Sequence, residues 1–134
     1  MTIVVGYRPD QFGEVALAHG ITRARATSSP LVLVHVVREG DRPGVRAAEA
    51  EQLRAEVRDK TGTDVSVRQP TGDDSAEEVL QVVREVNAGL LIIGIRPRTA
   101  VGKLLMGSTA QRILMDSPVP VLAVKPGQAA AAVL

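Results

Sequence analysis

The segment from Gly94 to Ser108 combines glycines with fixed positive charges, and these residue types can bind an anion. Its three cations are Arg96, Arg98 and Lys103. The sequence Ser108-Thr-Ala-Gln111, which follows Gly107, has the pattern of a capping box and predicts the start of a helix. Unpaired N–H groups at a helix start, a hydroxyl group and nearby cations are donors that hold phosphate in proteins. The segment therefore indicates a phosphate-binding site.

A purely structural interpretation of the same segment remains open. The glycines would then only permit a tight turn, Ser108 would only cap a helix, and the cations would be solvated.

Two known phosphate-binding motifs are excluded by the sequence. A Walker loop requires a glycine where Pro97 stands and a hydroxyl where Leu104 stands. A dinucleotide fingerprint requires three spaced glycines after the first strand, where the chain has Gly6 alone.

Short apolar runs rich in valine, isoleucine and leucine predict the strands that would position this segment. Four runs have no alternation between apolar and polar residues, and these are 3–6, 31–37, 90–95 and 119–124. A weaker run, 64–68, does alternate. Continuous apolar runs are typical of parallel strands that helices cover on both faces.

The segments between these runs predict four helices. The first follows Pro9 with Asp10 as its N-cap, and the second spans about 44–60. The third begins at the capping box Ser75-Ala-Glu-Glu78, and the fourth ends before Pro118. The alternation of five strands with four helices predicts a doubly wound α/β fold, a three-layer sandwich around a parallel sheet. We expect one domain over residues 1–126 and a frayed tail over residues 127–134.

The predicted topology adds residues to the candidate site. In doubly wound sheets, ligands bind outside the carboxyl ends of the strands, at the point where the strand order reverses. This rule adds the segments 7–10 and 36–38 to the segment 95–108. Tyr7, Arg8 and Val36 are therefore candidate binding residues, together with Thr109 at the predicted helix start.

The composition excludes several classes of site and partner. The chain has no cysteine, so we expect no disulfide, thiol nucleophile or cysteine-ligated metal. A net charge of +1, with one tyrosine, one phenylalanine and no tryptophan, disfavours nucleic acid as a partner. The apolar runs are too short to cross a membrane and no secretory signal is present, so we expect a cytoplasmic protein with no membrane partner.

The titratable residues do not predict catalysis or metal binding. His35 lies on an apolar run without a carboxylate or nucleophile beside it in the sequence, so we expect a packed structural residue. His19 falls off the apolar stripe of the first helix, and we expect it in solvent. Asp73 and Asp74 are an adjacent acidic pair that we expect to supply negative charge at a helix start. Without a general base, we expect no enzyme activity.

Five segments, 3–6, 31–37, 91–94, 107–114 and 117–124, occur in an order that resembles the universal stress protein family. The resemblance covers residues 2 to about 126. It implies a flavodoxin-like, or Rossmann-like, domain that usually forms homodimers.

Nucleotide-binding members of that family share the pattern Gly-x-x-Gly, nine residues, then Gly followed by Ser or Thr, which holds the ATP phosphates. Gly94, Gly107 and Ser108 match the pattern. Pro97 stands at the second glycine and has no amide hydrogen to donate. The resemblance implies ATP or AMP as the ligand, Mg²⁺ as a companion of ATP, and no covalently bound cofactor.

The same members have an acidic residue after the first strand that reads adenine. Arg8 stands at this position, and Val36 matches a position whose backbone faces adenine. Losing a neutral donor and a base-reading carboxylate together costs a few kcal/mol, which charge-assisted bonds of about 1.5 to 3 kcal/mol each from the nearby cations would partly offset.

We therefore expect a regulator of the stress response that binds an adenine nucleotide without catalysis. Its expected binding residues are Tyr7, Arg8, Val36, Gly94, Arg96, Arg98, Lys103, Gly107, Ser108 and Thr109. The alternative is a nucleotide-independent dimeric interaction or signalling module whose basic loop binds a protein partner or another anion. A third hypothesis is an enzyme, such as a flavoprotein, on the same scaffold.

The last predicted strand indicates how the chain would assemble. Pro120 lacks the N–H that a central strand needs, so we expect the run 119–124 at a sheet edge. Pairing with the same strand of a second chain would cover this apolar edge, and the family resemblance also implies such a dimer. The expected interface residues are Val119, Val121, Leu122 and Val124. In the alternative, the protein is a monomer whose tail folds over the edge.

Overall fold

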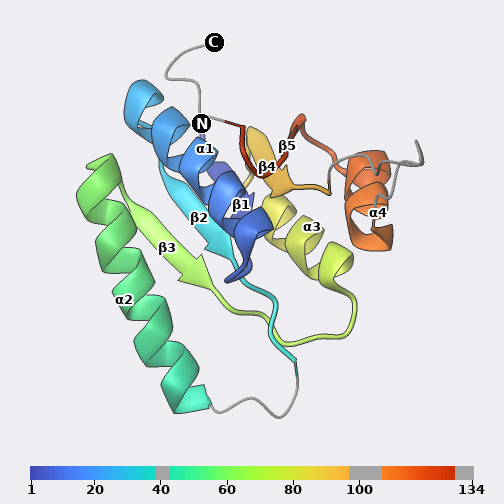
Figure 1. Ribbon diagram of the computed structural model, residues 1–134, viewed down its shortest axis with the longest axis horizontal. Helices are drawn as coiled ribbons and strands as arrows, with labels where there is room; N and C mark the ends of the chain where they lie inside the picture. The colour runs from blue at the N-terminus through green and yellow to red at the C-terminus, as the bar shows by residue number, and fades with distance from the viewer. Residues whose placement is uncertain (39–42, 97–106, 129–134) are drawn as a thin grey trace.

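The computed structural model of the chain describes residues 1–38, 43–96 and 107–128. Within these residues, strands and helices alternate in chain order (Figure 1). The elements are β1 (Ile3–Gly6), α1 (Gln11–Thr27), β2 (Leu31–Val34), α2 (Pro43–Thr61), β3 (Val65–Arg68), α3 (Ser75–Glu85), β4 (Leu90–Gly94), α4 (Ser108–Asp116) and β5 (Val121–Val124). The order and type of all nine predicted elements are confirmed.

The five strands form one parallel sheet in the order β3-β2-β1-β4-β5. Strand β1 is central, because Ile3 pairs with Leu31 of β2 on one side and with Leu90 of β4 on the other. The sheet grows outward from β1 to β3, and the chain then returns to place β4 on the other side of β1. The strand order therefore reverses between β1 and β4, as in a doubly wound Rossmann-type sheet.

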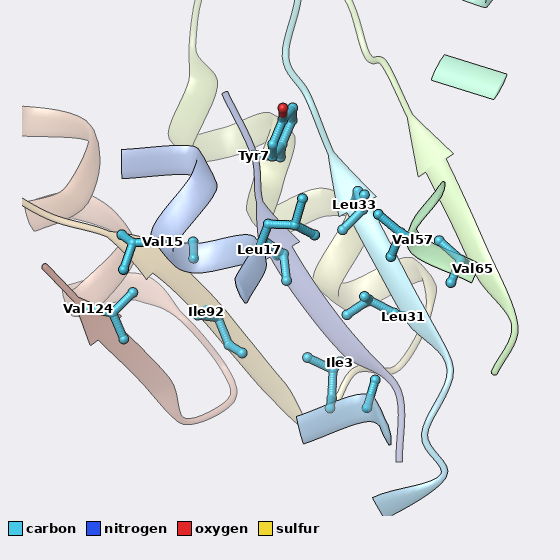
Figure 2. Packing of buried hydrophobic residues seen from close by; sticks show 13 residues of the cluster. Ile3, Tyr7, Val15, Leu17, Leu31, Leu33, Val57, Val65, Ile92 and Val124 are labelled. Atoms are coloured by element: carbon cyan, nitrogen blue, oxygen red, sulfur yellow. The ribbon is translucent and has the colours of Figure 1, made fainter. Parts of the chain in front are cut away.

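Helices cover both faces of the sheet and make three layers. On one face, α1 and α2 pack against alternate residues of the strands, among them Ile3 and Val5 of β1 (Figure 2). On the other face, α3 and α4 pack against the residues in between, including Val4. These three β1 side chains are fully buried. The continuous apolar runs of the sequence are thus explained by burial on both faces of the sheet.

The last strand lies at a sheet edge, as predicted from Pro120. It begins at Val121, two residues later than the apolar run. Pro120 lies just before the strand, and its carbonyl oxygen accepts a hydrogen bond from the Leu91 amide at 3.0 Å. The missing N–H of Pro120 is therefore outside the paired segment.

The N-cap of α1 is Asp10, as predicted, and the caps of α3 and α4 differ from the prediction by one residue. In α3 the cap is Asp74, whose Oδ1 accepts a hydrogen bond from the Glu77 amide at 3.1 Å. In α4 the cap is Gly107, with extended dihedral angles and no side-chain hydrogen bond. The prediction of Ser75 and Ser108 as caps is wrong, because Asp74 and Gly107 keep non-helical dihedral angles while Ser75 and Ser108 are already the first helical residues.

The expectation that His19 is in solvent is also wrong. Its side chain is half-buried, and its Nε2 is shielded from solvent without a hydrogen-bond partner among the described residues. Helix α1 packs against α2 and β5 as well as the central strands. Its contact surface is therefore wider than the apolar stripe from which the expectation was made.

Candidate functional site

A cavity of about 320 Å³ opens at the carboxyl ends of the strands, where the strand order reverses. The sheet side of the cavity includes five of the predicted site residues: Tyr7, Arg8, Val36, Gly94 and Arg96. Helix α4 and its cap supply three more: Gly107, Ser108 and Thr109. Segments far apart in the sequence therefore meet at one site. Arg98 and Lys103 lie outside the described residues.

One wall of this cavity consists of residues 8–13 with Gly94, and we call it the α1 wall. Two glycines allow its backbone segments to pack closely. A methyl group on Gly94 would lie 2.2 Å from the Phe12 carbonyl oxygen. A methyl group on Gly13 would lie 1.7 Å from the Arg8 carbonyl oxygen. Such distances are far inside van der Waals contact. Gly94 therefore permits close backbone packing between β4 and α1.

The Arg8 side chain is held against the same wall. Its Nε lies 3.2 Å from Asp10 Oδ2, and its guanidinium carbon lies 5.8 Å from the centre of the Phe12 ring. The other Asp10 oxygen, Oδ1, accepts hydrogen bonds from the Phe12 and Gly13 amides at 3.0 and 2.9 Å. Asp10 thus caps α1 and pairs with Arg8.

Tyr7 directly follows the carboxyl end of β1 and belongs to the buried cluster on the α1 and α2 face of the sheet (Figure 2). Its hydroxyl donates a hydrogen bond to Glu14 Oε1 at 2.8 Å, and its ring meets the His35 ring edge to face, with centroids 6.0 Å apart. Burial, and then the hydrogen bond to Glu14, raise the pKa of Tyr7 above its ordinary value of 10.0. Tyr7 is therefore a neutral, anchored part of the cavity, and His35 packs as the sequence predicts.

The first turn of α4 forms a second wall, which we call the α4 wall and define as residues 107–110. The first helical hydrogen bond runs from the Gln111 amide to the Gly107 carbonyl oxygen at 3.0 Å. The amides of Ser108, Thr109 and Ala110 precede this bond and have no acceptor within the helix. All three residues line the cavity. The α4 wall therefore presents amide donors, with the positive end of the helix dipole, to the cavity.

The comparisons with known proteins agree with this fold. The model of the universal stress protein family matches residues 1–125. The chain belongs to the universal stress protein family. A universal stress protein of Mycolicibacterium smegmatis is 43% identical to this chain over 127 residues, which are 92% of this chain and 97% of that protein.

Solved structures of universal stress proteins share the fold. One from Archaeoglobus fulgidus has a TM-score of 0.74 at 25% identity and covers 92% of this chain and 97% of its own. A universal stress protein in complex with cAMP has a TM-score of 0.73 at 23% identity, with 95% and 98% covered. An Archaeoglobus fulgidus universal stress protein in complex with dAMP has a TM-score of 0.70 at 20% identity, with 92% and 96% covered.

The sequence reasoning missed the contribution of α3 to the site of this universal stress protein. Ser75 and Val79, one turn apart on α3, line the cavity. Helix α3 reaches the site because it is the crossover from β3 back to β4, so its first turn follows the carboxyl edge of the sheet. The capping pattern identified this helix start, but only the strand order places it beside α4.

The described lining consists of backbone groups, apolar side chains, hydroxyls and two arginines. It includes the guanidinium groups of Arg8 and Arg96 and several hydroxyls, but no histidine, cysteine or carboxylate among the described residues. The described ranges also contain no cluster of three metal-ligating side chains, and no helix in them is long and apolar enough to span a bilayer. The arrangement is suited to holding an anion.

Proposed function

We propose that this universal stress protein is a non-enzymatic regulator that binds an adenine nucleotide, AMP or ATP, in the cavity between β1, β4 and α4. The observation that carries the proposal is the α4 wall. Its unpaired amides border a cavity at the point of strand reversal, where doubly wound folds bind phosphates. The related structures in complex with cAMP and dAMP support the choice of an adenine nucleotide.

In this proposal the phosphates lie against the α4 wall and Arg96. Ser108 contributes its hydroxyl group, which does not cap the helix because Gly107 is the N-cap of α4. Arg98 and Lys103 are proposed to add positive charge from the same loop, and Mg²⁺ would accompany ATP. No covalently bound cofactor is part of the proposal.

The base is proposed to contact the backbone of Val36. The His35 and Val37 amides bond to the Arg68 and Pro70 carbonyl oxygens on the β3 side. Because alternate amides of an extended chain point to opposite sides, the Val36 amide points toward the β1 side, and Val36 lines the cavity. Among the described residues it has no backbone acceptor, so it is available to an adenine nitrogen.

Calorimetric titration of the purified protein with AMP, ADP and ATP tests the proposal. We expect saturable binding and a thermal shift at ligand concentrations far above the dissociation constant. Adenosine, which lacks the phosphate, is expected to bind more weakly than AMP. The absence of heat and of a thermal shift at millimolar nucleotide would reject the proposal. Nucleotide incubated with the protein should stay intact, because the described lining has no general base.

A second candidate function is a nucleotide-independent module that binds another anion or a protein partner. The observation in its favour is that the described lining carries Arg8 and Arg96 without a carboxylate to accept from the adenine amino group. Titration with inorganic phosphate separates the two functions. Phosphate that binds as tightly as AMP supports the module, because the base then contributes nothing.

We also propose that residues 1–126 form a single domain with a tail at 127–134, and that the domain dimerises through β5. Val121 and Leu122 are half-exposed on this edge strand, and Val119 lies beside it. Val124 is buried within the chain, so its proposed contribution to the interface is through its backbone. Light scattering should give twice the chain mass, and V121K should give the mass of one chain.

A further inference from the structure

Arg112 connects α4 to the first turn of α3. Its Nη1 donates a hydrogen bond to Asp74, and its Nη2 donates one to Glu77 Oε2 at 3.1 Å. Its Nε lies 3.5 Å from Asp116 Oδ2, one turn along α4. One guanidinium group thus joins three carboxylates on two helices.

The link matters because the described residues make few other contacts with α4. Within α4, all of which is described, Ile113 is the one buried residue. Ala110 is half-buried and packs against the cluster of buried residues that includes Ile113. Helix α4 packs chiefly against α3, so the α3 contact sets its orientation.

Both joined turns border the cavity. Asp74 caps α3 immediately before Ser75, which lines the cavity, and the α4 wall lies on the first turn of the helix that carries Arg112. A rotation of α4 about Ile113 would therefore move the amides of the α4 wall relative to Ser75.

We propose that Arg112 is a positioning residue that holds the α4 wall in place for a phosphate group. The inference rests on the proposed function, since it names the residue that orients the phosphate-binding amides of the α4 wall. An isolated exposed ion pair contributes little to the free energy of unfolding, but a network of several charges can fix a geometry. Arg112 joins three carboxylates, and the effect of this network is on the orientation of α4.

The main test compares R112A with R84A in the full chain. Arg84 is a matched control, because its Nη2 donates to Glu77 Oε1 at 2.8 Å but it lies on α3, and its ion pair and hydrogen bonds among the described residues are to α3 side chains. Both variants remove one positive charge of similar exposure. We expect R112A to weaken AMP binding by about tenfold and R84A by less than about twofold. Adenosine binding should change little in either variant, and R112K should recover part of the AMP affinity.

A second variant separates positioning from charge. D74N/E77A removes both α3 carboxylates that hold Arg112, and asparagine can still cap α3. If charge alone mattered, the loss of two negative charges near the cavity would tighten AMP binding. Positioning predicts the opposite sign, a weakening similar to that of R112A. Tighter or unchanged AMP binding in D74N/E77A would overturn the inference.

Amide hydrogen exchange gives a readout that needs no ligand. We expect faster exchange in the last two turns of α4 in R112A than in R84A, with the exchange of β1 unchanged. Equal exchange in the two variants would overturn the inference. A wild-type protein that binds no nucleotide would reject the proposed function instead, and the exchange result would still decide whether Arg112 holds α4.

Discussion

The two walls of the cavity are built by different physical means. The α1 wall is closed by backbone packing, with Gly13 against Arg8 and Gly94 against Phe12. The α4 wall belongs to a helix with a single buried side chain, Ile113, and exposed ion pairs to α3. Close packing tolerates little displacement, whereas exposed ion pairs can break at small cost. The α1 wall is therefore the more rigid of the two walls, and the position of the α4 wall is easier to change.

The largest expected effect is on the α1 wall. G94A places a methyl group against the Phe12 backbone, so α1 must move away from β4, and we expect a loss of about 3 kcal/mol or more in the free energy of unfolding. G107A on the α4 wall is the matched control, because nothing lies within 4 Å of the added methyl group. Urea denaturation of both variants measures the difference. Equal losses would show that the two walls do not differ in packing.

The anchor of α4 is expected to have the next largest effect. I113A removes the one buried side chain of the described helix, and we expect it to cost about 2 kcal/mol. Its neighbour Leu114 is 38% exposed, so L114A should cost less than about 1 kcal/mol. Chemical denaturation checks both values. A similar cost for the two variants would mean that α4 has another anchor.

The cap of α1 contributes less than the packing beneath it. D10A leaves the Phe12 and Gly13 amides without their acceptor and should cost about 1 to 2 kcal/mol. D10N keeps an acceptor oxygen but loses the charge that pairs with Arg8, so we expect a smaller loss, under about 1 kcal/mol. Thermal unfolding of the two variants gives the order. If D10N lost as much as D10A, the ion pair rather than the cap would stabilise this turn.

The smallest expected effect is a pH dependence on the α4 side. The Glu77 amide, and then the Arg112 guanidinium, hold the pKa of Asp74 below its ordinary value of 3.8. A lowered pKa means that ionised Asp74 stabilises the fold above its ordinary pKa, and that this contribution is lost as the pH falls through the lowered value. The melting temperatures of wild type and D74N should therefore differ at neutral pH and converge in acid.

D73N is the control for this titration, because Asp73 makes no ion pair among the described residues. Its melting temperature should stay close to that of wild type at each pH. A D74N curve that runs parallel to wild type down to the lowest pH would contradict the assignment of the effect to the ionisation of Asp74.

The sequence was most informative where a local pattern determined the outcome. The doubly buried strands were predicted from their continuous apolar runs, and the start of α1 was predicted from Asp10 beside Pro9. Eight of the ten predicted site residues line one cavity, because chain order and the rule on strand ends place them together. That they bind a ligand stays a prediction.

Features that depend on contacts between elements could not be predicted in this way. Arg112 and Asp74 are 38 residues apart, and no local pattern indicates that they meet. The half-buried state of His19 depends on how α1 packs against its neighbouring elements, which no local pattern gives. The α3 and α4 caps were misplaced by one residue because serine, aspartate and glycine all satisfy the cap pattern, and the backbone dihedral angles decide among them.

The central place of β1 in the sheet also bears on how the chain folds during synthesis. Ile3 pairs with Leu31 and with Leu90, so one of its two neighbouring strands is translated much later than the other. At about 5 to 20 residues per second, β4 follows β1 from the ribosome by roughly 4 to 17 s. Throughout this interval the nascent chain exposes one edge of its central strand. Chaperones that bind extended apolar segments would have their best opportunity in this interval, before β4 pairs with β1.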